Sequence, residues 1–481
     1  MGSGLIFLKT AMQNVSNEAT FLTGVIEGFY GPPWSSVERM TLFDWMRRCG
    51  FNTYMYAPKD DLKHRAQWRQ QYTQTEAADL QTLIRAASEH GLEFLYALSP
   101  GLDITYSSTA DHEALQGKLA QVLSLGAKHF CLLFDDIPDQ MHPEDSKRWT
   151  SLAAAQASTT NAIFLWIRQQ EPSSRFLFCP TPYCGRMAMR EHGGKNYLAI
   201  LGQELLPEID VFWTGSEIIP EEITVQETRD LASLLRRKPV VWENLHANDY
   251  DGRRFYCGPY SGRPPELRQE LAGLLCNPNC EFPVNFVPWL TLGKFLHGSP
   301  DWNPRQAYLE AMREWHSQFL TAGAPISYED LVLFGDCHYL PYESGPEAEI
   351  LFDLTRKLLQ GDPLAMPDIL AQFRERSERL RSCCARMAEL INRPLFNAIH
   401  RRVWELREEI DLLQRCIEHR ANPAIRHTPF RADFHLPHTY RGSFVAHLQK
   451  FLVQEADGAF TVAQSLDTKK STPETKPASI T

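Results

Sequence analysis

Residues 129–140 read HFCLLFDDIPDQ, an apolar run that ends abruptly in two adjacent aspartates, Asp135 and Asp136. A short run that is apolar at every position is typical of a strand buried on both faces, as in a parallel sheet covered by helices. The paired acids follow at its carboxyl end, which is the end where ligands bind in parallel α/β folds. The stretch therefore predicts a buried parallel strand with a functional site at its end.

Seven further apolar or aromatic runs of strand length occur before residue 300, and segments with helical periodicity lie between most of them. This alternation predicts an α/β fold of the closed (β/α)8 TIM-barrel type, whose usual size is roughly 250 residues. An open doubly wound sheet is the alternative, but it normally carries a Gly-rich phosphate turn after its first strand, and EGFYGPPW at 27–34 lacks that pattern. The expected strands cover residues 24–29, 52–57, 94–99, 129–134, 175–180, 210–215, 239–244 and 282–287, and the expected helices 36–49, 76–90, 112–125, 147–169, 224–235 and 265–276.

From about residue 300 the pattern becomes almost entirely helical. Apolar residues there follow a heptad spacing, which indicates a helical bundle. We interpret this seam as the internal core of the bundle, and a dimer contact between two chains is the alternative. The expected domains are an N-terminal extension (1–20), the barrel (21–300), the all-α helical bundle (301–460) and a polar, disordered tail (461–481). The seam consists of Ile399, Val403, Leu406, Ile410, Leu413 and Ile417.

Charge and composition exclude several classes of partner. The chain carries 49 basic and 59 acidic residues, a net charge of −10. Sequence-independent nucleic-acid binding needs a basic face, so we expect no nucleic-acid partner. No apolar stretch approaches the roughly 18 residues of a membrane span, and no secretory signal pattern is present. We therefore expect a cytoplasmic protein without a membrane partner.

The cysteines indicate neither disulfides nor a metal site. There are 11 of them, an odd number, scattered along the chain and often in apolar contexts. This usage is typical of reduced, buried thiols in a cytosolic protein. The motif CNPNC at 276–280 lacks a second half-site at zinc-binding spacing. We expect no metal and no organic cofactor.

Polar, aromatic and acidic residues gather where the expected strands end. In a barrel these positions all lie at one mouth, where the loops that follow the strands carry the active site. The residues at these ends are Gly28, Tyr30 and Trp34; Lys59, Asp60 and Asp61; Asp103; Asp135 and Asp136; Tyr183; Ile218; and Trp242, Asn244, His246, Asn248, Asp249 and Tyr250.

Two adjacent aspartates favour catalysis over the simpler interpretation of a helix cap. Repulsion between like charges raises the pKa of one member, which suits a proton donor, while its ionised neighbour stabilises charge. Glycoside hydrolysis normally uses two carboxylates on opposite sides of the scissile bond, whereas sequence neighbours approach from one side. That geometry suits substrate-assisted hydrolysis, in which a 2-acetamido group of the sugar is the nucleophile. Asp103 or Asp249, on other strand ends, remain alternatives for an opposing carboxylate.

Eight motifs along the barrel region resemble those of glycoside hydrolase family 84, the O-GlcNAcase-like β-N-acetylglucosaminidases. YLPYES at 339–344 and the helices after it resemble the helical stalk of the animal-type enzymes. The eight motifs are GVIEGFYGPPW (24–34), NTYMYAPKDDLKHR (52–65), SPGLDITYS (99–107), LLFDDI (132–137), FCPTPYCG (178–185), VFWTG (211–215), WENLHANDYD (242–251) and NPNCEF (277–282).

The resemblance implies a retaining exo-β-N-acetylglucosaminidase that removes O-linked N-acetylglucosamine from Ser and Thr of proteins through an oxazoline intermediate. It implies that Asp135 orients the acetamido group and that Asp136 is the general acid/base. Relatives of the animal type also pair through their helical region, so a homodimer is expected. The sugar-binding residues implied by the resemblance are Gly28, Lys59, Tyr183, Ile218, Trp242, Asn244, Asp249 and Asn277.

Alternatives remain for the substrate. Free glycans or a hyaluronan-like polymer are alternative substrates, and a barrel that binds the sugar without turnover is the alternative to an enzyme. Two departures from the family pattern adjoin expected contacts. Glu243 stands where the family motif WDN has aspartate, and Pro182 stands beside Tyr183 where glutamate is common.

Overall fold

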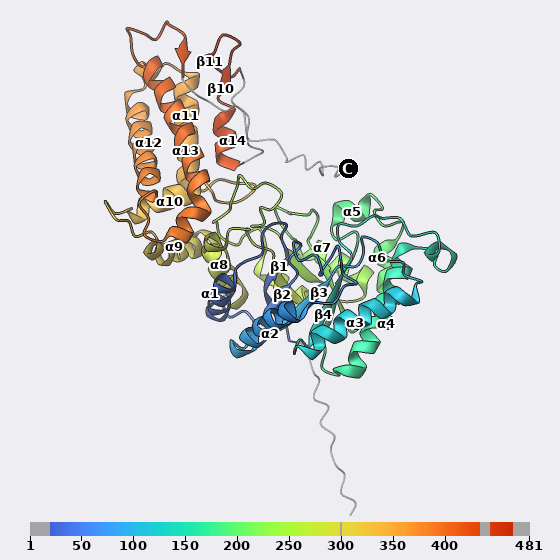
Figure 1. The fold of residues 1–481 in the computed structure, drawn as a ribbon. Coiled ribbons are helices and arrows are strands. Elements are labelled where there is room, and N and C mark those ends of the chain that lie inside the picture. The colour runs from blue at the N-terminus through green and yellow to red at the C-terminus, as the bar shows by residue number, and fades with distance from the viewer. Residues whose placement is uncertain (1–19, 299–300, 433–442, 465–481) are drawn as a thin grey trace, which may run out of the picture.

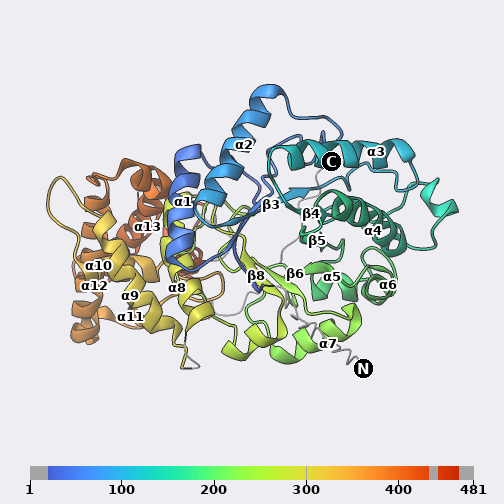
Figure 2. The same cartoon turned by 90° about the horizontal axis from the view of Figure 1, so that it is seen from below.

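Eight parallel strands close into a barrel in chain order, β1 to β8, and helices surround it (Figures 1 and 2). The computed structural model describes residues 20–298, 301–432 and 443–464. This confirms the predicted α/β barrel followed by a helical domain. The strands are β1 (Leu22–Glu27), β2 (Thr53–Tyr56), β3 (Glu93–Leu98), β4 (His129–Leu133), β5 (Phe176–Cys179), β6 (Ile209–Trp213), β7 (Val240–Glu243) and β8 (Gly273–Cys276).

The eighth strand is not where the sequence pattern placed it. Residues 282–287, expected as a strand, form the 3-10 turn η3 (Phe282–Asn285) and the start of α8 (Phe286–His297). The strand that closes the barrel is β8, which pairs with β7 on one side and β1 on the other. It lies inside the expected helix 265–276, of which only the 3-10 helix η2 (Pro265–Glu270) forms. A four-residue buried strand carries no periodicity that separates it from a helix.

The helices around the barrel begin where capping residues predict them. Ser35 and Glu38, Thr73 and Glu76, and Thr224 and Glu227 form reciprocal capping boxes at three helix starts. Two helices between β5 and β6 were not expected. The helices are α1 (Ser36–Arg48), α2 (Gln74–Glu89), α3 (Thr109–Ser124), η1 (Asp145–Lys147), α4 (Leu152–Gln170), α5 (Gly185–Met189), α6 (Tyr197–Glu204) and α7 (Val225–Leu235), with α5 and α6 the unexpected pair.

The barrel interior is filled by side chains, which leaves its mouth as the place for a ligand. Alternate residues of each strand point inward and are buried in one inner cluster, since strand side chains alternate with a period of two. Apolar layers of this kind make a barrel core rather than a pore. The inner cluster includes Ile26, Met55, Leu95, Cys131, Leu133, Leu177, Phe212, Val240, Trp242 and Leu275.

A helical domain stands beside one flank of the barrel, next to α8 and α1 (Figures 1 and 2). All six residues of the heptad seam are buried within this chain, which confirms the interpretation of the seam as internal core. The expected dimer stays a prediction. The domain contains α9 (Pro304–Trp315), η4 (His316–Gln318), α10 (Tyr328–Asp336), α11 (Pro346–Gln360), η5 (Pro363–Ala365), α12 (Pro367–Met387), α13 (Arg393–Arg420) and α14 (Ser443–Gln449).

A small antiparallel sheet, absent from the expected all-α bundle, joins β9 (Phe430–Arg431), β10 (Leu452–Gln454) and β11 (Ala459–Val462). Residues 461 and 462, expected in the tail, therefore belong to β11. The expected extension, apart from residue 20, and residues 465–481 of the expected tail lie outside the described residues. Among the helices that the structure describes, none combines the length and apolar character needed to cross a bilayer.

Candidate active site

Asp135 is buried directly after β4 and is held as an anion. Its Oδ2 accepts a hydrogen bond from Nζ of Lys59, which follows β2, at 2.8 Å. Burial alone raises the pKa of this carboxyl group, but the positive charges of Lys59 and Arg65 outweigh it and hold the pKa below its usual value. Its other oxygen, Oδ1, is buried and makes no hydrogen bond to any described residue. Asp135 thus offers a charged, unoccupied acceptor.

Asp136 has a different environment from its neighbour. Its side chain is exposed, and its carboxylate accepts hydrogen bonds from the hydroxyl of Tyr183 to Oδ1 at 2.8 Å and from the hydroxyl of Tyr30 to Oδ2 at 3.1 Å. Its backbone has φ 48°, in the left-handed region that few non-glycine residues adopt. Nη2 of Arg65 donates to its carbonyl oxygen at 2.7 Å and stabilises that conformation. Strain of this kind clusters at functional sites.

A chain of amides connects the ends of β7 and β8. Nδ2 of Asn244 donates to the carbonyl oxygen of Ile218 at 2.9 Å, and Nδ2 of Asn277 donates to Oδ1 of Asn244 at 3.0 Å. Both asparagines are buried, and Oδ1 of Asn277 has no partner among the described residues. The amide orientations are therefore determined by the protein, and one acceptor is left for a ligand.

Trp242 and Gly28 form an apolar surface at the mouth. A Cβ on Gly28 would lie 3.1 Å from Cζ2 of Trp242 and 2.8 Å from Cγ2 of Ile26, so only glycine brings the backbone this close to the indole. Trp242 packs edge-on against Phe212, with ring centroids 5.3 Å apart. The indole therefore belongs both to the inner cluster of the barrel and to its mouth.

Asp249 lies near the paired aspartates, at the other end of Tyr30. Its Oδ2 accepts the backbone N–H of Tyr30 at 2.9 Å, while the Tyr30 hydroxyl contacts Asp136. Burial, together with the negative charge of Asp136, raises the pKa of Asp249, although the Tyr30 N–H acts against this. Tyr30 thus connects two acidic groups of the site.

Two expected candidates have structural partners instead. Asp103 accepts hydrogen bonds from Trp68 Nε1 and Arg69 Nη1, both at 2.7 Å, so each of its carboxylate oxygens already has a partner. Nε2 of His246 lies 3.0 Å from the carbonyl oxygen of Gly258, and burial lowers the pKa of this histidine to about 3. It is a neutral structural residue.

Glu243 is buried in the wall of the barrel, behind the site. Its carboxylate pairs with Nε and Nη2 of Arg263 at 2.8 Å each and accepts the Tyr260 hydroxyl at 3.0 Å. Glu243 and Arg263 are 1% and 3% exposed, so the pair is sealed in the wall of the barrel. Glu243, which replaces the usual aspartate of the family, is therefore bonded inside the barrel wall and not at the mouth.

The sequence pattern missed the roles of two residues. Tyr30 was noted only as a residue after the first strand, yet it contacts both Asp136 and Asp249. Arg65 lies in the quoted motif NTYMYAPKDDLKHR, and its contact is with a backbone carbonyl, which leaves no signal in the partner's residue type. The position of Tyr30 directly after a strand was the available signal.

Cofactor ligands are not grouped at this site. All 11 cysteines are free, and ten of them are buried, as expected of reduced thiols. Within the described parts of the chain, no three His, Cys, Asp or Glu side chains are grouped so that they can hold a metal ion.

Comparisons with known proteins agree with this geometry. A sequence profile of one protein family, described as beta-N-acetylglucosaminidase, matches residues 23–327. The proteins named Protein O-GlcNAcase from Rattus norvegicus and Mus musculus are each 47% identical to this chain over 272 residues. That alignment covers 56% of this chain and 29% of each relative, so the chain matches less than a third of their length.

A solved structure of an O-GlcNAc hydrolase mutant from Thermobaculum terrenum has the same fold. It superposes with a TM-score of 0.73 and 28% sequence identity. The match covers 82% of this chain and 83% of that one, so it includes the helical domain as well as the barrel.

Proposed function

The chain belongs to glycoside hydrolase family 84, the β-N-acetylglucosaminidases, and from this premise we propose that it removes β-linked N-acetylglucosamine from Ser and Thr side chains of proteins. The observation that carries the proposal is the pair of neighbouring aspartates. One is a buried anion with a free oxygen, and the other is an exposed carboxylate held by two tyrosine hydroxyls.

Asp135 orients the nucleophile, which the substrate itself supplies. Its free Oδ1 accepts the acetamido N–H, and its negative charge increases the electron density on the acetamido carbonyl oxygen. That oxygen attacks the anomeric carbon from the face opposite the leaving group as the glycosidic bond breaks. The product is a five-membered protonated oxazoline ring, whose positively charged N–H stays hydrogen-bonded to the Asp135 carboxylate. The Lys59 ammonium keeps Asp135 ionised. Because an ionised carboxylate carries no proton, Asp135 accepts the hydrogen bond from the acetamido N–H.

Asp136 transfers the protons. It donates one to the glycosidic oxygen as that bond breaks, then takes one from the water that opens the oxazoline ring. Each step inverts the anomeric carbon, so the configuration is retained overall. The hydroxyls of Tyr183 and Tyr30 hold its carboxylate. We assign Tyr183 a contact with the acetamido oxygen once the sugar is bound.

The remaining residues bind the sugar. Asp249 accepts sugar hydroxyls, and the amides of Asn244 and Asn277 contact sugar oxygens and hydroxyls. Trp242 closes the acetamido pocket beside Gly28, and Ile218 orients Asn244 through its carbonyl oxygen. We assign Asp249 to the sugar rather than the scissile bond because Tyr30 lies between it and Asp136.

Two assays test the activity and its substrate. Release of the chromophore from an aryl β-N-acetylglucosaminide separates an enzyme from a barrel that binds the sugar without turnover. An O-GlcNAc peptide, chitobiose and a hyaluronan oligosaccharide are then compared by kcat/KM. The proposal expects the peptide to be preferred; a preference for either glycan would replace the proposed substrate.

The buried ion pair predicts a pH effect. Replacing Lys59 with methionine removes the cation but leaves Asp135 buried, so the pKa of Asp135 rises. Because the ionised form orients the nucleophile, the acid limb of the pH profile of kcat/KM moves towards neutral pH. Lys63→Met is the matched control, since its ammonium pairs with Glu76 away from the site. An acid limb that does not move in Lys59→Met would contradict the role of this pair.

A further inference from the structure

The helical domain contacts the two barrel loops that carry sugar-binding residues. The loop after β7 contains Asn244 and Asp249, and the loop after β8 contains Asn277. Neither loop is supported by a helix of the barrel until η2 and η3 begin. Their support therefore has to come from each other and from whatever covers them.

Asparagine side chains join the two loops to each other. Oδ1 of Asn248 accepts the backbone N–H of Cys280 at 2.8 Å, and Asn279 makes two hydrogen bonds to the backbone of Tyr256, at 2.8 and 2.9 Å. Both asparagines are 1% exposed or less. The two loops are therefore hydrogen-bonded to each other, and a contact that holds one of them also holds the other.

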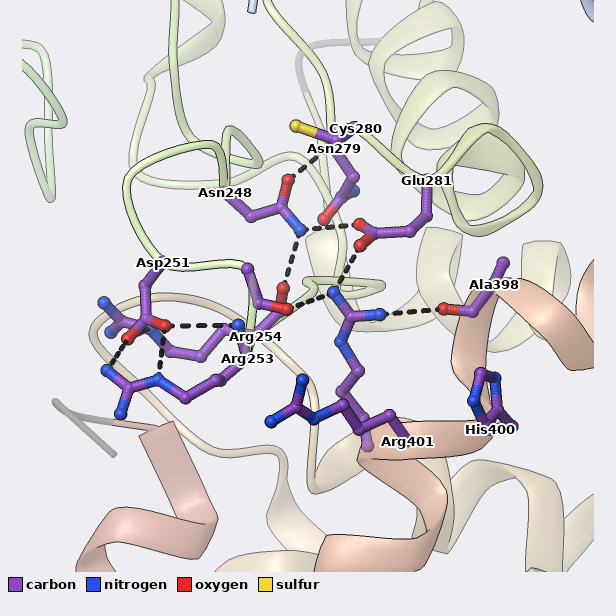
Figure 3. Close-up of polar contacts among 12 residues, drawn as sticks. Asn248, Asp251, Arg253, Arg254, Asn279, Cys280, Glu281, Ala398, His400 and Arg401 are labelled. Carbon is purple, nitrogen blue, oxygen red and sulfur yellow. Dashed lines mark hydrogen bonds and ion pairs between the residues drawn. The ribbon is translucent and has the colours of Figure 1, made fainter. Parts of the chain in front are cut away.

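Arg402, on α13 of the helical domain, is bonded to both loops. Figure 3 shows the labelled residues around this contact, among them Asn248, Glu281 and Ala398. Its Nη2 donates to the carbonyl oxygen of Gly252 in the first loop and to Oε1 of Glu281 in the second. Nη1 donates to the carbonyl oxygen of Ala398 at 3.0 Å, and this bond holds the guanidinium against its own helix. A planar guanidinium holds its N–H donors in a fixed fork, so one group reaches an acceptor on each loop and a third on its own helix.

Glu281 links Arg402 to Asn248, the residue next to Asp249. Its Oε1 is bonded to Arg402, while its Oε2 accepts Nδ2 of Asn248 at 2.7 Å. The side chains of Arg402 and Glu281 are only 10% and 18% exposed, so the ion pair is shielded from water. Removing one partner of a shielded pair is costly because it leaves the other charge unpaired.

We propose that Arg402 is a positioning residue through which the helical domain holds Asp249 in its sugar-binding position, by way of Glu281 and Asn248. This inference rests on the proposed function, since it assigns the helical domain a part in binding the same sugar. Arg402 does not touch the sugar; it acts through the loop.

The domain contact does not depend on Arg402 alone, which makes the inference testable. Backbone N–H groups of Cys257 and Gly258 donate to the carbonyl oxygens of His338 and Tyr339, both at 2.8 Å. The His338 ring also stacks on Phe255, with centroids 4.3 Å apart. These contacts keep the domain attached when Arg402 is replaced.

The test compares Arg402→Met with Arg401→Gln on the full chain. Arg401 directly precedes Arg402 on the same helix. Its side chain is 67% exposed and forms an ion pair with Glu405 of that helix. We expect Arg402→Met to lower kcat/KM on the aryl glycoside about tenfold, mainly through KM, as for the loss of a hydrogen bond to a charged group. Arg401→Gln should keep wild-type values, and both variants should keep the wild-type circular dichroism spectrum.

A second readout separates positioning from a general loss of structure. Aryl glycosides lacking the 3-, 4- or 6-hydroxyl are assayed with the wild type and with Asp249→Asn, which identifies the hydroxyl or hydroxyls that Asp249 contacts. Arg402→Met should reduce the penalty for deleting those hydroxyls and leave the penalty for any other unchanged. Glu281→Gln, which keeps the side-chain size, should show the same selective change if Arg402→Met does not fold.

The outcomes distinguish the inference from the proposed function. No turnover by the wild type would overturn the proposed function. Wild-type turnover, with Arg402→Met and Glu281→Gln keeping the full penalty for the hydroxyl or hydroxyls that Asp249 contacts, would overturn this inference alone. An equal change in all three penalties would also overturn it, because it would indicate a general structural effect.

Discussion

Replacing Asp136 with asparagine is expected to slow hydrolysis of a serine glycoside by about 10²–10⁴-fold, the usual contribution of general acid–base catalysis. The asparagine amide keeps the size of the side chain and accepts hydrogen bonds from Tyr30 or Tyr183, but its N–H protons are not acidic enough to protonate the leaving oxygen. An activated aryl glycoside, whose leaving group departs without protonation, should lose far less in the step that forms the oxazoline. The measurement is kcat/KM for both substrates with the same enzyme preparations.

Two results sharpen this prediction. Small anionic nucleophiles such as azide need no general base, so added azide should restore turnover of the aryl glycoside by Asp136→Asn. Equal losses on the serine and aryl glycosides would contradict the assignment of Asp136 as the acid.

Replacing Asp135 with asparagine is expected to slow both substrates, and by a similar factor. The loss should reach about 10²–10³-fold, because a preorganised charge aimed at the reacting group is removed from a buried site. The choice of leaving group does not matter here, since Asp135 acts on the nucleophile. Lys59 would then face a neutral amide, so the variant also needs a thermal unfolding curve to show that it remains folded.

An inhibitor separates the two aspartates further. A thiazoline analogue of N-acetylglucosamine resembles the cyclised intermediate, and an enzyme binds the state that it stabilises more tightly than the ground state. The wild type should bind the thiazoline far more tightly than N-acetylglucosamine. Asp135→Asn should weaken the thiazoline much more than the plain sugar, because the protonated ring nitrogen of the thiazoline forms an ion pair with the carboxylate, whereas the plain sugar offers only a neutral N–H. Equal weakening of both would contradict the role of Asp135.

Most of the barrel follows from local sequence pattern. Seven strands begin and end close to their expected positions because each is a short apolar run bounded by polar residues. The eighth fails because residues 273–276 continue the helical spacing of the segment before them, and only pairing with β1 and β7 makes them a strand. Residues 282–287 look like a strand but are apolar because α8 is buried between the barrel and the helical domain.

The site follows from the sequence less completely. Strand ends indicate Asp135, Asp136, Asn244 and Asp249, because a barrel brings every strand end to one mouth. A contact to a backbone atom cannot be predicted from the residue type of the partner. The hydrogen bond from Arg65 to the carbonyl oxygen of Asp136 is such a contact. Arg402 is further removed: the heptad seam predicts its helix, but no sequence pattern indicates that this helix contacts the barrel loops.

The central claim is that the substrate's own acetamido oxygen is the nucleophile. It is tested most directly with aryl glycosides whose acetyl group carries zero, one, two or three fluorine atoms. Fluorine withdraws electrons and makes the carbonyl oxygen a poorer nucleophile, so kcat/KM should fall steadily across the series. A flat response, or a glycosyl ester trapped on any carboxylate of this chain, would show that the protein supplies the nucleophile instead.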